Sequence, residues 1–169
     1  MDIVLKPIGV VVEGIPRKDE LKNLPRDKRS KYKFISTLQI FDEYLDGLLG
    51  LEEYSHCIII WYMHMENDTV LKVRPWGDQS LPIVGIFATR FPPRPNKVAL
   101  TVVEILEVSP PYLKVRGLDA WSGSPIIDIK PYDYYDIVKN PRVPKWFHER
   151  WLRWYKEKEY DKYVPWLGP

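Results

Sequence analysis

The sequence predicts a mainly β protein, a small antiparallel β-barrel followed by a C-terminal α-helix. Short segments rich in Ile and Val recur between residues 3 and 130, and turns or loops join most of them. Helices do not alternate with these segments, which argues against a parallel sheet. From residue 145 onward the apolar residues recur at helical spacing.

The expected strands are residues 3–12, 34–41, 56–64, 81–89, 98–108, 112–118 and 125–130. The first segment is interrupted by Pro7 and Gly9, which indicates an edge position or a bulge. The segment 56–64 (HCIIIWYMH) is continuously apolar, as in a strand that is buried on both faces. We therefore expect a closed or nearly closed barrel of about six or seven strands.

The connections between these segments carry their own signals. Residues 14–31 are polar, contain two prolines and indicate a long loop with a basic bias. Residues 42–51 fit a short helix that Asp42 caps and Gly50 ends. The apolar face of this helix would consist of Tyr44, Leu45, Leu48 and Leu49. A polar loop is expected at 66–82 and a linker at 133–145.

The C-terminal helix, residues 145–160, places Phe147, Trp151, Trp154 and Tyr155 on one face. We favour packing of this face against the barrel or against a second subunit. The alternative is an RNA clamp, in which basic residues meet phosphates and a free aromatic ring stacks on a base. The expected organisation is a barrel domain at 1–140 and a helical extension at 141–169.

Composition excludes several classes of protein. The net charge of +2 is too even to indicate nucleic-acid binding, so an RNA surface would need local clustering of basic residues. The single cysteine, Cys57, excludes an internal disulfide and lies in an apolar run, as a buried inert thiol does. We find no signal peptide and no apolar run near the roughly 20 residues of a membrane helix, so we expect a cytoplasmic protein without a membrane segment.

Common cofactor and metal motifs do not occur in the sequence. Neither a GxGxxG pattern nor a P-loop is present, so a Rossmann cofactor site or a nucleoside triphosphatase is unsupported. With one cysteine, and with His56 and His64 eight residues apart, we expect no metal site.

Three local features suggest a binding site, and each has a structural alternative. Residues 90–96 (RFPPRPN) form a rigid loop whose arginines and asparagine suit carboxylates, phosphates or bases, or else a rigid connection with solvated arginines. His64 ends a buried strand and would emerge beside a barrel mouth, where it could contact a ligand. The alternative is a histidine in the core or at the rim whose hydrogen bonds are all made within the protein. Residues 119–125 offer backbone amides to a ligand, or form a plain hairpin connection.

Motifs in four places resemble one family when they are taken together. Residues 50–56 (GLEEYSH) resemble the pattern G-L-E-x-F-S-H, and residues 85–96 resemble G-V-F-A-T-R-S-x-x-R-P-N. Residues 117–120 (GLDA) and 128–132 (DIKPY) resemble L-D-x-x-D-G-T-P-V-x-D-I-K-P-Y. In order and spacing, the chain is similar to the TrmO-like family, also called YaeB or TsaA type.

The resemblance implies a small β-barrel that binds S-adenosylmethionine, usually as a homodimer, and that modifies tRNA. Family members methylate N6 of threonylcarbamoyl-adenosine next to the anticodon. Donor binding is implied for Pro25, Arg26, Met63, His64, Arg90, Leu100, Ser122, Gly123, Ser124 and Pro125. Substrate binding is expected of Arg94, Asn96, Lys130 and Tyr132.

The chain departs from the family pattern at several of these positions. Met63 replaces an aromatic residue, Asp27 replaces Gln after Pro25-Arg26, and Ser122 replaces an acid. The pattern R-P-N-P-I-G becomes residues 94–99 (RPNKVA), so a Pro and a Gly are lost together. These changes mean altered donor geometry, another acceptor or lost catalysis.

Methyl transfer needs the acceptor, the methyl group and sulfur to be held in line. Trp61, Tyr62 or Trp121 would face the sulfonium, and Asp119, Asp128 or His64 would take the acceptor's proton. Two alternatives remain, a non-catalytic S-adenosylmethionine sensor and a methyltransferase that acts on a non-RNA substrate.

Overall fold

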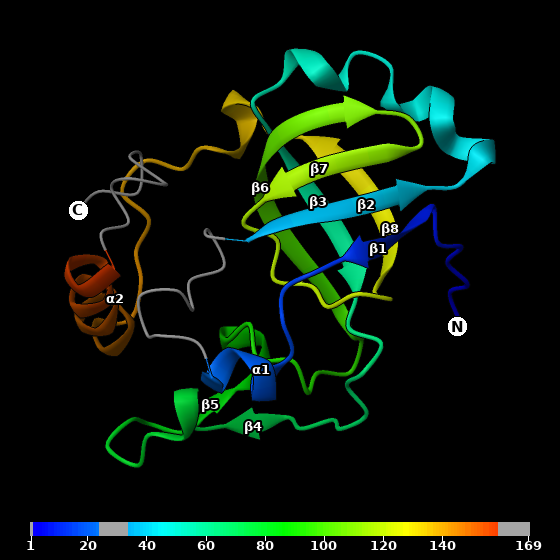
Figure 1. Cartoon of the computed structure of the whole chain (residues 1–169). Helices are drawn as coiled ribbons and strands as arrows, with labels where there is room; N and C mark the ends of the chain where they lie inside the picture. The colour runs from blue at the N-terminus through cyan, green and yellow to red at the C-terminus, as the bar shows by residue number, and fades with distance from the viewer. Residues whose placement is uncertain (1, 24–33, 159–169) are drawn as a thin grey trace.

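Six strands form one closed antiparallel barrel in the computed structural model, which describes residues 2–23 and 34–158 (Figure 1). Around the barrel the order is β1 (Gly9–Glu13), β2 (Ile35–Ile40), β7 (Tyr112–Arg116), β6 (Val98–Ser109), β3 (His56–Tyr62) and β8 (Pro125–Pro131). β8 pairs with β1 and closes the ring. The expected mainly β fold is confirmed, as is the C-terminal helix, α2 (Lys145–Lys158).

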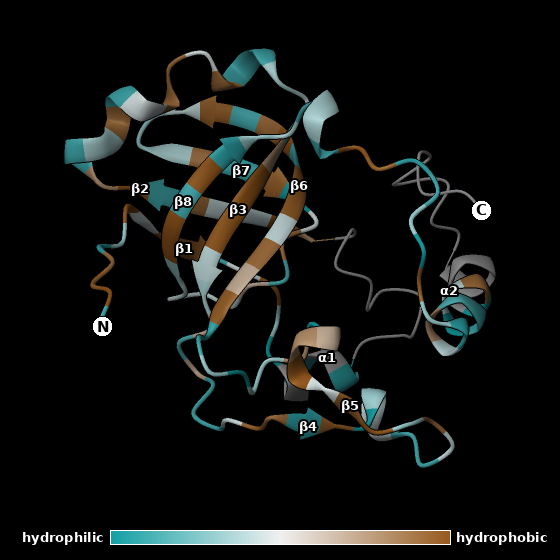
Figure 2. Cartoon of the chain, turned by 180° about the vertical axis from the view of Figure 1, so that it is seen from behind, coloured by the Kyte–Doolittle hydropathy of each residue, from teal (hydrophilic) through white to brown (hydrophobic). Residues whose placement is uncertain are grey.

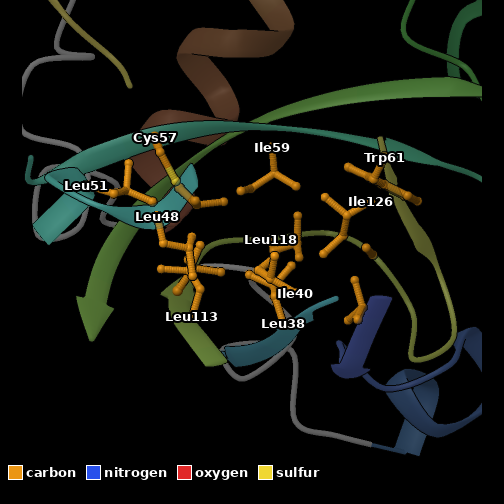
Figure 3. Close-up of a cluster of buried hydrophobic side chains, with 14 residues drawn as sticks. Leu38, Ile40, Leu48, Leu51, Cys57, Ile59, Trp61, Leu113, Leu118 and Ile126 are labelled. Carbon is orange, nitrogen blue, oxygen red and sulfur yellow. The ribbon is translucent and has the colours of Figure 1, made fainter. Parts of the chain in front are cut away.

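Side chains from alternate strand positions fill the interior of the barrel (Figure 3). On β3, the inward residues Cys57, Ile59 and Trp61 are at most 8% exposed. The outward face of β3 is apolar too, which explains the continuous hydrophobic run (Figure 2). Burial raises the pKa of the Cys57 thiol to about 12, because the thiolate would lose its hydration. The thiol is therefore protonated at neutral pH.

β1 fits between β2 and β8 through a close backbone approach. Gly9 pairs with Ile40 on one side and with Ile126 on the other. A Cβ on Gly9 would lie 2.4 Å from the carbonyl oxygen of Gln39, so a residue with a side chain does not fit without a shift of the backbone. The closure of the barrel depends on this glycine.

The segment 81–89 was expected to be a barrel strand, and this expectation is wrong. Only β5 (Val84–Gly85) is extended, and it pairs with β4 (Lys72–Val73) in a separate two-stranded sheet. Six strands already close the barrel, so it has no free edge for another. Residues 65–96 leave the barrel after β3 and return at β6 (Figure 1). We call this segment the excursion.

The chain between β1 and β3 also differs from expectation. β1 begins at Gly9, after Pro7, and not at residue 3. The expected loop at 14–31 contains α1 (Lys18–Asn23), and its later part lies outside the described residues. Further short helices are η3 (Asp42–Leu48), η4 (Leu51–Glu53), η5 (Pro75–Gly77), η6 (Ile86–Ala88) and η7 (Tyr134–Asp136).

The helix expected at 42–51 forms as the two 3₁₀ helices η3 and η4. Asp42 is not its cap, because Phe41 holds the N-cap position and makes no side-chain cap. Leu49 is 90% exposed, although Leu48 is buried. Leu49 follows η3 as its C-cap, where ψ is 125° and the backbone is no longer helical, so its side chain leaves the face that Leu48 occupies. Gly50 follows with a φ of 84°, which separates the two helices.

α2 packs against the excursion of its own chain, at the turn that contains Trp76. The Trp76 ring centroid lies 5.7 Å from that of Trp146 and 6.4 Å from that of Phe147. The Arg150 guanidinium lies 4.3 Å from the Trp76 ring centroid and 3.7 Å from the Asp78 carboxylate. The described contacts of α2 are therefore with the excursion. The sequence had favoured packing against the barrel or a second subunit. None of the described helices has the length and apolar character needed to cross a bilayer.

Replacing Gly9 by Ala should destabilise the barrel by about 1–3 kcal/mol, because the added methyl group forces the backbone of β1 and β2 apart. Urea unfolding measures the change. Gly47→Ala is the matched control, since a Cβ there meets nothing within 4 Å. Equal stability of Gly9→Ala and the wild type would contradict the role given to Gly9.

Replacing Trp76 by Ala should loosen α2 and leave the barrel intact, because aromatic pairs are worth about 0.5–1.5 kcal/mol each. Hydrogen exchange should become about tenfold faster in residues 145–153, since that factor corresponds to roughly 1.4 kcal/mol. Tyr135→Ala, at a side chain that is 97% exposed, is the control. Unchanged exchange in α2 would show that other contacts hold the helix.

Candidate functional site

The topology gathers most of the expected site residues at one end of the barrel, which we call the mouth. Neighbouring strands are antiparallel, so the exits of β1, β3 and β7 meet the entries of β2, β6 and β8. Backbone hydrogen bonds join these ends: Met63 donates to Lys97, Ile15 to Ala120, and Gly117 to Phe34. α1, β4 and β5 lie beyond this end of the barrel (Figure 1).

His64 meets the loop of residues 122–125 at the mouth, as the family resemblance implies. Its Nδ1 lies 3.2 Å from the Ser124 hydroxyl, across 60 positions of sequence. Ser124 is 1% exposed, whereas His64 is half-buried. A Cβ on Gly123 would lie 3.5 Å from His64 Nε2, so the imidazole ring packs over the glycine backbone. The serine orients the ring, and the ring edge remains at the rim of the mouth.

The chain that leaves β1 holds this loop in place. The Gly123 amide donates to the Val11 carbonyl at 2.8 Å, and the Val11 amide donates to the Ser124 carbonyl at 3.0 Å. The Gly14 amide donates to the Ser122 hydroxyl at 3.0 Å. A Cβ on Gly14 would lie 2.4 Å from the Ala120 carbonyl oxygen, so this crossing also requires glycine.

A pocket of about 490 Å³ opens beside Ser122. It is lined by Gly14, Ile15, Pro16, Arg17, Glu20 and Ser122. Its volume falls within the range of about 300–1,000 Å³ that is typical of small-molecule sites. Its lining offers one arginine, one carboxylate and one hydroxyl, a set that suits a zwitterionic ligand.

Pro16 and Arg17, which line the pocket, were not among the site residues expected from the sequence. The early Pro-Arg element was assigned to Pro25 and Arg26, which lie outside the described residues. The dipeptide Pro-Arg occurs at both places, and only the first follows directly from β1. The glycine at position 14 was the signal that could have distinguished the two, because a strand exit that crosses another backbone closely needs one.

A hydrogen-bond chain that begins in the core ends at Asp119, which is exposed. The Trp61 indole donates to the Thr101 hydroxyl at 3.2 Å, and that hydroxyl donates to Asp119 Oδ1 at 2.5 Å. Trp61 is 8% exposed and belongs to the core, so it does not face a ligand. Of the three aromatic candidates, Tyr62 and Trp121 are the more accessible.

The excursion brings Arg90 and Arg94 to the same end of the barrel. The Arg94 guanidinium donates to the Thr89 carbonyl at 3.1 Å and fastens its own loop, whereas Arg90 and Asn96 are exposed. Leu100, the third residue of β6, is 51% exposed on the outer surface of the barrel. Among the described contacts, neither Arg90 nor Leu100 is hydrogen-bonded to His64 or to the 122–125 loop.

Lys130 and Tyr132 lie away from the mouth. The Tyr132 amide donates to the carbonyl of His56, which begins β3 at the far end of the barrel. Asp128 pairs with Lys130 at 2.7 Å on the outer surface, and this hydrogen bond raises the pKa of the lysine. The structure therefore does not bring these three to His64. Within the described residues no group of His, Cys, Asp and Glu could hold a metal ion.

Comparison with known proteins identifies the family. Residues 17–137 match the family model described as the tRNA-methyltransferase O N-terminal domain. A protein of Archaeoglobus fulgidus named S-adenosyl-L-methionine-binding protein is 45% identical over 130 residues, covering 77% of this chain and 89% of the relative. A crystal structure of TrmO from Pseudomonas aeruginosa superposes with a TM-score of 0.64 at 28% identity, covering 84% of this chain.

The match spans only part of that TrmO, since it covers 62% of the solved chain. The family match itself extends over most of the barrel and ends before α2. This protein therefore belongs to the tRNA-methyltransferase O N-terminal domain family.

Proposed function

We propose that this protein binds S-adenosylmethionine at the mouth and transfers its methyl group to tRNA, at N6 of threonylcarbamoyl-adenosine next to the anticodon. The observation that carries the proposal is the contact of His64 with Ser124, because two motifs 60 residues apart converge beside a pocket. Family membership and the names of the relatives support it.

In this proposal, the donor lies between His64, the 122–125 loop and the pocket. Arg17 binds the carboxylate of its methionine part, since a guanidinium is the strongest partner for that group. Arg90, which is exposed on the excursion, is the second cation that the proposal assigns to the donor. Met63 follows β3 at the mouth, next to His64. Leu100, on the outer surface, and Pro25 and Arg26, outside the described residues, belong to the proposed donor site by the family pattern alone.

The bound donor supplies a methyl group on a positively charged sulfur, which leaves as a neutral thioether. Tyr62 or Trp121 faces this cation with its ring. Asp119 accepts the proton that the acceptor nitrogen loses when its bond to carbon forms. The Trp61–Thr101 chain fixes the carboxylate for this role. Asp128 suits the role less well because Lys130 neutralises it on the outer surface.

The tRNA partner is supported by the distribution of charge along the sequence. Residues 139–158 contain seven Lys or Arg and two Glu, although the net charge of the whole chain is only +2. A basic segment attached to a nearly neutral barrel suits a phosphate backbone. We further propose that residues 1–140 are the donor-binding domain and 141–169 the helical extension of a cytoplasmic homodimer, with Arg94 and Asn96 toward the RNA.

A sensor that binds the donor without turnover is the second candidate. It is favoured by the replacement of an acidic family position by Ser122, which lines the pocket. A sensor would bind S-adenosylmethionine and leave all cellular tRNA unchanged. Tritium transfer from labelled donor to tRNA separates the two functions.

Replacing Arg17 or Arg90 by Ala should each weaken donor binding by about 1.5–3 kcal/mol, the usual worth of a hydrogen bond to a charged group. Isothermal titration with S-adenosylhomocysteine measures this affinity. Arg142→Ala, at an exposed linker position, is the matched control. An arginine whose loss leaves the affinity unchanged does not contact the donor.

Cells that lack this protein should lose one methyl group from threonylcarbamoyl-adenosine, as measured by nucleoside mass spectrometry of tRNA. The wild-type protein should restore it, and Asp119→Asn should lower the methylation rate by about 10²–10⁴-fold while the donor still binds. Asp46→Asn, at an exposed position of η3, is the control. Identical nucleosides with and without the protein would refute tRNA as the substrate.

A further inference from the structure

Lys97 is buried at a position where the sequence departs from the family pattern. Its residue is 7% exposed, and its ammonium makes three hydrogen bonds. The acceptors are the Asp68 carbonyl at 2.6 Å, the Thr69 hydroxyl at 2.6 Å and the Arg94 carbonyl at 2.8 Å. An ammonium has three donors, so every one is matched by a neutral oxygen. We call this arrangement the Lys97 cage.

The acceptors of the cage come from both ends of the excursion. Asp68 and Thr69 lie shortly after His64, and Arg94 lies shortly after Arg90. Two backbone bonds reinforce the junction: the Met63 amide donates to the Lys97 carbonyl at 2.8 Å, and the Val70 amide donates to the Pro93 carbonyl at 3.0 Å. The lysine therefore fastens the chain that follows His64 to the chain that follows Arg90.

We propose that Lys97 is a positioning residue, which sets the place of the Arg90 loop relative to His64 and so determines the affinity for the methyl donor. The inference rests on the proposed function, because the donor is what would bridge the two segments. The family pattern has Pro at this position and Gly two residues later, and this chain has neither. An ammonium held by three oxygens replaces the rigidity that the proline ring would give.

A purely structural role for Lys97 makes a different prediction. A buried lysine can simply stabilise the fold, and its loss would then affect the donor only through general loosening. Val115→Ala provides that comparison, because Val115 is fully buried in the core and pairs with Ile105, eight residues beyond Lys97. The two variants can be compared at equal loss of thermal stability.

The experiment compares the full-length wild type, Lys97→Met, Thr69→Val, Thr69→Ser and Val115→Ala. Titration with S-adenosylhomocysteine gives the affinity, and hydrogen exchange reports the amide of Val70 as an internal check. We expect Lys97→Met to weaken binding at least about tenfold, the equivalent of one charged hydrogen bond, and to expose the Val70 amide. Thr69→Val should weaken binding less, and Thr69→Ser, which keeps the hydroxyl, should restore it.

The outcomes separate the two hypotheses. Binding by Lys97→Met as tight as by the wild type, or an equal loss in Val115→Ala, would overturn the positioning role. If Lys97→Met does not fold, the pair at Thr69 decides, since equal affinities of the Val and Ser variants would overturn it as well. A wild type that binds no S-adenosylhomocysteine would overturn the proposed function, and the positioning role with it.

Discussion

The insertion of β1 between β2 and β8 is the constraint on which the rest of the structure depends. This strand has five residues, yet it closes the barrel and then continues under the loop before β8. Gly9 and Gly14 permit the two close crossings, because a side chain at either would run into a carbonyl oxygen. The bonds of Val11 to residues 123 and 124 then fix the loop that His64 contacts. The strand that closes the barrel is therefore also the strand that positions the site loop.

The excursion, by contrast, belongs to no barrel sheet and is held at two separate places. Its base is fastened by the Lys97 ammonium, and its tip is covered by α2 through Trp76. Much of its remaining apolar surface faces outward, with Phe87 78% and Leu71 67% exposed. The excursion, which carries the arginine loop, is thus attached to the barrel end by Lys97 and to the C-terminal helix by Trp76.

Some strands were predictable from sequence, because burial imposes a readable pattern. The apolar run of β3 and the strand expected at 112–118, which forms as β7, lie nearly where they were expected. The segment 81–89 is also largely apolar, but the closed barrel offers it no edge, and ring closure cannot be read from local sequence. Likewise, the sequence did not indicate that the helix would end at Leu48, which leaves Leu49 at the C-cap with its side chain exposed.

For the candidate site, the motif resemblance correctly predicted that His64 lies next to the 122–125 loop. It did not indicate that residues of one motif can lie far apart in space. Pro125 and Lys130 stand close in the family pattern, yet a strand advances about 3.3 Å per residue and carries them toward opposite ends of the barrel. The Pro-Arg dipeptide occurs at 16–17 and again at 25–26, and sequence alone does not tell which copy follows the exit of β1. Proximity along the chain is a poor guide to proximity in a barrel.

The burial of Cys57 has a practical consequence. It is the single cysteine of the chain, it lies in the core, and its thiol has a pKa of about 12. Maleimides and other electrophiles react with exposed thiolates, so the folded protein gives almost no background labelling. One cysteine introduced at Glu20, on the wall of the pocket, would carry a fluorophore or spin label at a unique position. Because Cys57 does not react, a single introduced label can report the entry of a ligand into the pocket by spectroscopy.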